Sequence, residues 1–209
     1  MKAIEFIQIW HTYTSELSKL PSWEDLWDST SGWTKEVQGI ENISDWHWSN
    51  HLRSALLKEI PEAELILKTE HRKIDFVAAR SINSFVCSMD EERKHSVSKR
   101  ALQYGFLEVV IEFENDFADC FREMIKLSKL RARLKVLVVY DYDHKQEADD
   151  RLLEIVRDNW QNIITESKGH LEEPGVEYLL VVGQLSQKNT NPILNWRYFS
   201  DSTELYANH

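Results

Sequence analysis

The sequence predicts a single α/β domain built on a mixed β-sheet. Segments with helical spacing of apolar residues alternate with short apolar runs rich in Val, Ile and Leu. Only six glycines and four prolines occur in 209 residues, too few for a turn-rich all-β fold. The expected order of elements is helix, strand, strand, strand, helix, strand, helix, strand, and the length suits one domain, 1–209.

The first 44 residues are expected to form an N-terminal helical extension. Apolar residues recur at helical spacing over 2–20, and Pro21 ends the pattern. Residues 21–44 mix tryptophans with Ser, Asp and Gly, which indicates short helices and loops. A second helix is predicted from Ser44 or Asp45 to about residue 60, where Pro61 stops it.

Residues 45–142 are expected to form the core, and 143–209 to complete the sheet. The predicted strands are 64–68, 74–78, 107–114, 136–140 and 178–182, with one more through Trp196 and Tyr198. Helices are predicted over 116–130 and 147–167, and an irregular insertion over 80–100. The run 136–140 is apolar on both faces, which is typical of a buried parallel strand.

The composition favours a cytoplasmic protein. Two cysteines, Cys87 and Cys120, are too few for a disulfide framework. No apolar run approaches the roughly 20 residues needed to span a bilayer, and the N-terminus lacks the pattern of a signal peptide. The net charge of −10 argues against nucleic-acid binding unless the positive charge is gathered on one surface.

Acidic residues interrupt two of the predicted strands. Glu112 and Glu114 share one face of an apolar strand, and Asp75 is embedded in a neighbouring apolar strand. Buried carboxylates are costly and repel one another, and a divalent cation such as Mg²⁺, which prefers oxygen ligands, removes that conflict. The alternative is a solvated sheet face, or acidic residues that merely favour the start of the next helix.

At these residues the sequence resembles the PD-(D/E)XK nuclease superfamily, whose core is helix, three strands, helix, strand. More narrowly it resembles the BamHI type of restriction endonuclease, which has E-x-E where most of the superfamily has (D/E)-x-K. The resemblance covers roughly residues 50–142. The segments that carry it are Ile-Glu-Phe-Glu-Asn at 111–115 with the helix after it, Ile74-Asp75, and Glu59-Ile60-Pro61. Ile74 stands where the motif has proline.

The resemblance implies a restriction-endonuclease-like fold and a Mg²⁺ site, with Mn²⁺ as a possible substitute. Asp75 and Glu112 would ligate the cation with the backbone carbonyl of Phe113. Glu114, standing where most relatives have lysine, would orient or deprotonate the attacking water. Glu59 would be an outer acidic member of the site. The resemblance also implies DNA as the substrate and a homodimer as the assembly.

Basic residues that could contact DNA follow the acidic strand and lie in the turn before Ile74. They are Arg122, Lys126, Lys129, Arg131, Arg133 and Lys73, with Lys135 next in the run. An ordinary solvated helix face explains such a run equally well.

Two further motifs are weaker signals. His47 and His51 are spaced to share a helix face and bind zinc, but no third ligand is evident. Asp141-Tyr142-Asp143 after a buried strand resembles the D-x-D of haloacid dehalogenase-like phosphatases, although His144 departs from that motif.

Two functional hypotheses follow. The first is a Mg²⁺-dependent endodeoxyribonuclease that hydrolyses DNA phosphodiester bonds, in restriction or phage defence. The second is a catalytically degenerate interaction protein on the same fold, whose acidic surface binds a protein partner. The carboxylate set favours the enzyme, and the net charge favours the interaction protein.

Overall fold

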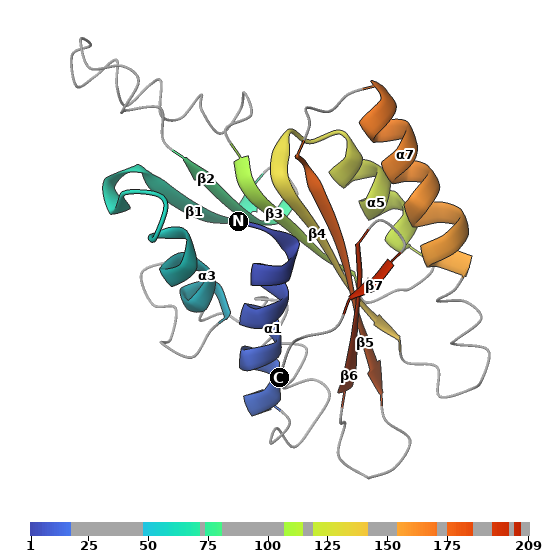
Figure 1. Ribbon diagram of the computed structural model, residues 1–209, viewed down its shortest axis with the longest axis horizontal. Helices are drawn as coiled ribbons and strands as arrows, with labels where there is room; N and C mark the ends of the chain where they lie inside the picture. The colour runs from blue at the N-terminus through green and yellow to red at the C-terminus, as the bar shows by residue number, and fades with distance from the viewer. Residues whose placement is uncertain are drawn as a thin grey trace.

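The computed structural model describes residues 1–17, 48–71, 74–80, 107–114, 119–141, 154–170, 175–185, 194–200 and 203–205 (Figure 1). Its helical elements are α1 (Ala3–Leu17), α3 (Trp48–Leu56), η2 (Glu62–Glu64), α5 (Cys120–Ser128), η4 (Ile155–Trp160) and α7 (Gln161–His170). Its strands are β1 (Leu65–His71), β2 (Ile74–Arg80), β3 (Leu107–Glu114), β4 (Ala132–Asp141), β5 (Glu177–Leu185), β6 (Leu194–Ser200) and β7 (Thr203–Leu205).

The seven strands form one mixed sheet in the order of the sequence, β1 to β7. β3, β4 and β5 are parallel to one another, and every other neighbouring pair is antiparallel. A parallel pair needs a crossover, and α5 lies in the connection from β3 to β4, while η4 and α7 lie in that from β4 to β5. The predicted mixed α/β architecture is therefore confirmed.

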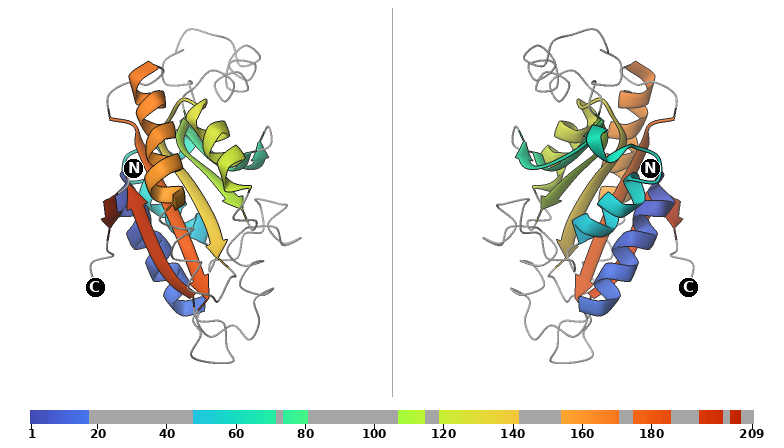
Figure 2. Two further views of the ribbon diagram at one scale, coloured as in Figure 1. Left: turned by 90° about the vertical axis from the view of Figure 1, so that its right-hand side faces the viewer. Right: turned by 90° about the vertical axis from the view of Figure 1, so that its left-hand side faces the viewer.

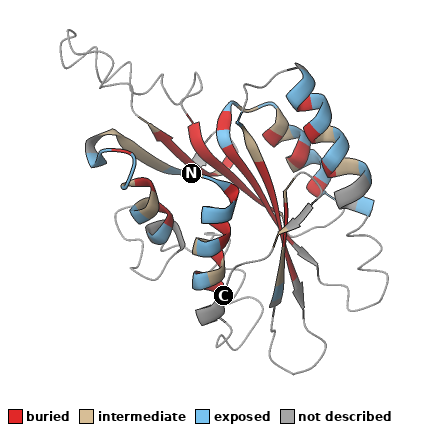
Figure 3. Cartoon of the chain, in the orientation of Figure 1, coloured by how far each residue is buried: buried red, intermediate tan, exposed pale blue. Residues whose placement is uncertain are grey.

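Helices cover both faces of the sheet, so the molecule has three layers. In Figure 2, α5 and α7 lie toward the viewer in the left-hand view, and α1 and α3 in the right-hand view. One core, between the sheet and α5, η4 and α7, includes Met124, Trp160 and Val110. The second core, between the sheet and α1 and α3, includes Trp10 and Phe113. The central strands are buried on both faces (Figure 3).

The first helix, α1, forms part of the layer on one face of the sheet. Phe6, Ile7 and Trp10 of α1 are fully buried against the sheet. The backbone N–H of Ala3, at the start of α1, donates a hydrogen bond of 2.6 Å to the Glu177 carboxylate on β5. Residues 1–17 of the predicted N-terminal helical extension thus pack onto the core, because this helix supplies large apolar side chains that cover the sheet face.

The predicted elements agree with the structure in order but differ at their ends. β4 starts four residues before the apolar run that predicts it, because its first residues alternate in burial as an ordinary strand does. The predicted helix over 147–167 is described from residue 154, and its residues 155–160 form a π-helical turn before α7. The predicted insertion at 80–100 and the Trp-rich segment 21–44 lie outside the described residues, apart from Arg80. No described helix is long and apolar enough to cross a membrane.

Candidate functional site

Glu112 is a buried carboxylate in the middle layer of the molecule. It lies on β3 with only 1% of its surface exposed. Its neighbours Ile111 and Phe113 point into the core beneath α1, so alternation along the strand turns Glu112 toward α5. Glu114, two residues on, shares that face at the end of β3 and is half-buried. The predicted common face of the two glutamates is therefore present.

Asp75 reaches the same place from β2. Phe76 pairs with Ile111 in the antiparallel register, so Asp75 lies beside Glu112 on the neighbouring strand. One carboxylate oxygen of Asp75 accepts a hydrogen bond of 2.7 Å from the backbone N–H of Phe113. Because the N–H and C=O of a strand residue point to the same side, the Phe113 carbonyl is also directed toward β2. The structure thus brings together the three residues predicted to hold a cation.

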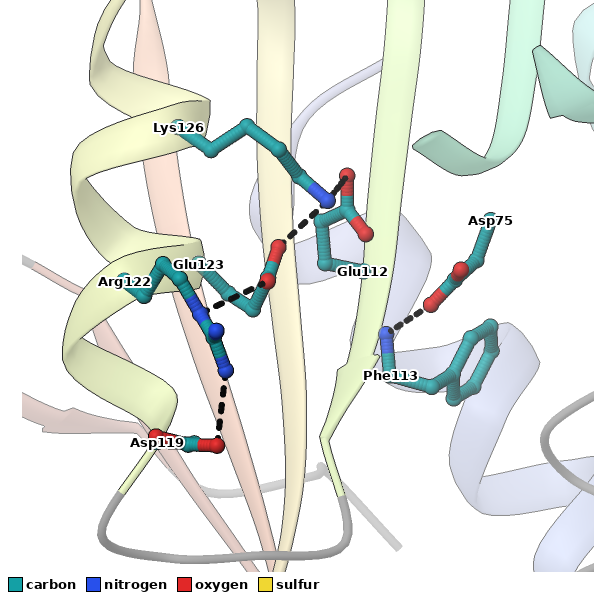
Figure 4. A network of polar contacts seen from close by, with 7 residues as sticks. All are labelled: Asp75, Glu112, Phe113, Asp119, Arg122, Glu123 and Lys126. Carbon is teal, nitrogen blue, oxygen red and sulfur yellow. Dashed lines mark hydrogen bonds and ion pairs between the residues drawn. The ribbon is translucent and has the colours of Figure 1, made fainter. Parts of the chain in front are cut away.

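A ladder of ion pairs connects Glu112 with the surface of α5 (Figure 4). The Lys126 ammonium lies 2.9 Å from Glu112 Oε1, and it also contacts the Glu123 carboxylate. The Arg122 guanidinium lies 4.0 Å from Glu123 Oε1 and 2.7 Å from Asp119 Oδ2. We call the residues of this ladder and its strand neighbours the Glu112 cluster, namely Asp75, Glu112, Phe113, Asp119, Arg122, Glu123 and Lys126.

The helix geometry explains why these side chains meet. Residues three apart on a helix are neighbours, which pairs Glu123 with Lys126 and Asp119 with Arg122. Met124 and Leu127 fix the inner face of α5 against the sheet. This orientation leaves the long stem of Lys126, 30% exposed, at the edge of the buried face, from which the ammonium reaches Glu112.

Burial dominates the electrostatics of the cluster. Burial raises the pKa of Glu112 to about 8; the Lys126 ammonium opposes this effect, and the Asp75 carboxylate adds to it. Burial alone would lower the pKa of Lys126, but Glu123 and Glu112 outweigh it, so the pKa of the ammonium is raised. The site therefore holds a carboxylate that is costly to ionise, beside a lysine that keeps its charge.

The oxygen donors of Asp75, Glu112 and the Phe113 carbonyl fit a hard divalent cation, which binds one or two carboxylates and keeps several waters. A buried carboxylate with a strongly raised pKa is also the kind of group that a cation stabilises. Within the described residues, no three His, Cys, Asp or Glu side chains are grouped tightly enough to hold a metal by themselves. Water or substrate oxygens would therefore have to complete the coordination.

Glu59 lies apart from this cluster. It is exposed in the turn after α3, a helix that packs on the opposite face of the sheet from Glu112. Among the described residues, its side chain makes no hydrogen bond or ion pair with the Glu112 cluster. The role predicted for Glu59 as an outer acidic member has no support in its position.

The residues predicted to contact DNA do not form one continuous basic surface among the described residues. Lys129 and Arg131 are exposed after α5, whereas Lys126 belongs to the Glu112 cluster. Arg122 and Arg133 are exposed but lie beside acidic partners, Arg133 at 3.4 Å from the buried Glu108. Lys73 lies outside the described residues. Lys135, next in the same run, is fully buried and belongs to no basic surface.

The described residues add no support for the histidine pair or for the D-x-D motif. His51, on α3, is exposed and lies near the Tyr13 ring, with 6.5 Å between ring centroids. His47 and Asp143 lie outside the described residues.

Sequence reasoning missed the counter-ion of Glu112. Lys126 is predicted as a DNA contact, but in the structure its ammonium contacts Glu112 of β3 and Glu123 of its own helix, α5. The signal was available in part, because the i, i+3 spacing of Glu123 and Lys126 follows directly from the sequence. What the sequence does not give is the rotation of α5 about its axis.

No protein-family model, curated protein or solved structure matches this chain.

Proposed function

We propose that the chain is a Mg²⁺-dependent nuclease with Asp75, Glu112 and Lys126 at its catalytic site. One observation carries the proposal. The buried Glu112 on the central strand β3 lies between Asp75, on the neighbouring strand β2, and the ammonium of Lys126, from α5. A leucine at this position would fill similar space without the cost of burying a carboxylate, so packing alone does not explain a glutamate here.

The topology supports this proposal. From α3 to β4 the order is helix, three strands, helix, strand, with β1, β2 and β3 antiparallel and β4 parallel to β3. That is the core order of the PD-(D/E)XK superfamily, which the sequence resembles over the same residues. Asp75 and Glu112 lie on the two strands that carry the motif in that resemblance.

The proposed roles follow from the positions of the side chains. Asp75, Glu112 and the Phe113 carbonyl would hold the cation, which when bound stabilises charge on the attacking and leaving oxygens at phosphorus. Glu114, on the same face of β3, would orient the attacking water. Lys126 would supply from α5 the positive charge that an E-x-E strand lacks, within reach of the phosphate oxygens.

Cleavage of supercoiled plasmid with Mg²⁺ or Mn²⁺ tests the proposal directly. Wild type should nick or linearise the plasmid, and Glu112→Ala should lower the rate by at least about a hundredfold. Glu154→Ala removes an exposed carboxylate at the first described residue of the last helical segment and should cleave as wild type does. Equal cleavage by wild type and Glu112→Ala would point to a contaminating nuclease and would count against this site. Light scattering tests the proposed homodimer separately.

A specific observation favours the second hypothesis, an interaction protein with a degenerate site. The ion pairs of Arg122 and Arg133 with acidic partners leave less positive surface for phosphates, and the chain carries a net charge of −10. If wild type is inert on duplex, single-stranded and modified DNA with either cation, this hypothesis replaces the nuclease. It then predicts that protein partners bind in a salt-sensitive way.

A further inference from the structure

Lys126 is placed between two carboxylates that lie on different elements. Its ammonium is 2.9 Å from Glu112 Oε1, on β3, and contacts the Glu123 carboxylate on its own helix (Figure 4). Glu112 is 1% exposed, whereas the Glu123 side chain is 15% exposed. One partner is therefore deep in the sheet and the other is nearer the surface.

The ammonium already contacts one oxygen, Oε1, of the carboxylate that a cation would use. Two positive charges on one carboxylate repel each other, and the repulsion is strong where water is largely excluded. The ammonium therefore weakens the binding of a divalent cation at Glu112, and its withdrawal favours that binding. Glu123 provides a place for it to go, because the contact between Glu123 and Lys126 lies within α5 and does not depend on Glu112.

The charge of the whole cluster fits this exchange. Burial favours the protonated form of Glu112, so a cation that binds there must also displace this proton. With Glu112 ionised, the cluster has four carboxylates and two positively charged side chains, namely Asp75, Glu112, Asp119 and Glu123 against Arg122 and Lys126. The difference is two negative charges, which one divalent cation balances. Arg122, the other positively charged side chain of the cluster, lies 4.0 Å from Glu123 and helps to hold that carboxylate in place.

We propose that Lys126 is an internal competitor of the divalent cation. When the cation binds, the Lys126 ammonium leaves Glu112 and remains on Glu123. This inference rests on the proposed function, since it assigns the regulation of the same site. It makes Glu123 a positioning residue: by taking the ammonium, Glu123 both frees Glu112 and keeps Lys126 beside the site, ready to contact phosphate.

Direct measurement of Mn²⁺ binding without DNA, by electron paramagnetic resonance or calorimetry, tests the exchange. Lys126→Met should tighten the apparent Kd for Mn²⁺ by about tenfold, because the competing charge is gone. Glu123→Gln should weaken it by about tenfold, because the ammonium is then left on Glu112. Lys58→Met, which removes an exposed positive charge from the turn after α3, should change the Kd by less than about twofold.

The double variant separates exchange from simple electrostatics. If Glu123 acts through Lys126, then Glu123→Gln should weaken binding far less in the Lys126→Met background than in wild type. Equal effects in the two backgrounds, or weaker binding by Lys126→Met, would overturn the inference while leaving the metal site standing. Circular dichroism checks that each variant folds, and Lys126→Gln replaces Lys126→Met if the latter does not.

A different result would refute the proposed function itself. If wild type binds no Mn²⁺, or if Glu112→Ala binds Mn²⁺ as wild type does, there is no metal site at Glu112 and both proposals are wrong. Retention of Glu112-dependent binding without the opposite shifts of the Lys126 and Glu123 variants overturns only the exchange.

Discussion

The Asp75 carboxylate accepts a hydrogen bond of 2.7 Å from the backbone N–H of Phe113, so a side chain on β2 takes up a backbone donor of β3. This contact lies next to the last described pair of the β2–β3 ladder, Phe76 with Ile111. Asp75 thereby fixes the end of the ladder at the point where Glu112 faces α5. The same carboxylate has a structural role and a proposed role as a metal ligand.

Two substitutions at Asp75 separate these roles. Asp75→Ala leaves the Phe113 N–H without this acceptor and should lower the free energy of unfolding by about 1–3 kcal/mol. Asp75→Asn keeps an acceptor oxygen but removes the charge, so it should retain most of the stability and still lose cation binding. Urea denaturation and Mn²⁺ binding measure the two effects. Similar stability of Asp75→Ala and wild type would show that the hydrogen bond contributes little.

The raised pKa of Glu112 predicts how stability depends on pH. The pKa is about 8 in the folded protein against an ordinary value of 4.5, chiefly because of burial. Between these values the folded state keeps a proton that the unfolded state has released, so the free energy of unfolding falls as pH rises through this window. Each unit of difference is worth about 1.4 kcal/mol, which makes the total several kcal/mol.

Glu112→Gln removes this dependence because an amide does not ionise. The variant should match wild type near pH 4.5 and become more stable than wild type as pH approaches 8, in thermal or urea unfolding without added metal. Glu154→Gln, at an exposed position, should follow the wild-type curve throughout. A constant difference between Glu112→Gln and wild type across this range would contradict the raised pKa.

A buried polar network holds α5, α7 and two strands together behind the site. The fully buried Lys135 ammonium on β4 lies 2.9 Å from the Tyr178 hydroxyl on β5, which donates a hydrogen bond of 2.8 Å to Ser167 Oγ. Ser167 in turn donates one of 3.0 Å to the carbonyl of Ser128, at the end of α5. The helix that carries Lys126 is thus anchored to the sheet at its last residue.

Tyr178→Phe should destabilise the protein by about 1–3 kcal/mol, since it removes a hydroxyl that both accepts from Lys135 and donates to Ser167. The matched control is Tyr198→Phe. Within the described part of the chain, the buried Tyr198 hydroxyl has no hydrogen-bond partner, so its removal should be neutral or stabilising. Equal losses in the two variants, measured by urea denaturation, would exclude a special role for the network.

Trp10 tests whether α1 belongs to the core. It is fully buried, and its ring lies 6.1 Å from that of Phe113 and 5.2 Å from that of Trp196, measured between centroids. Trp10→Ala should cost about 3–5 kcal/mol. Ile4→Ala, on the exposed side of the same helix, should cost less than about 1 kcal/mol. A small loss in the free energy of unfolding for Trp10→Ala would show that α1 contributes little to the core.

The elements and the anomaly of the acidic strand could be predicted from the sequence. Apolar spacing identified α1, α3, α5 and the strands β1 to β6 in their order, because helical and strand periods are visible among residues only a few positions apart. The short strand β7 was not predicted. The shared face of Glu112 and Glu114 follows from strand alternation alone. The strand that carries Asp75 could also be expected beside them, but the register that sets Asp75 against Glu112 could not, since strand pairing joins residues far apart in the chain.

Only the tertiary structure decided what surrounds those carboxylates. The pairing of Lys126 with Glu112 depends on the rotation of α5 above the sheet, which Met124 and Leu127 fix by packing. The inclusion of α1 in the core depends on which sheet face is left uncovered by the other helices. Both are long-range outcomes, set by how much apolar surface each arrangement buries, and no local pattern in the sequence records them.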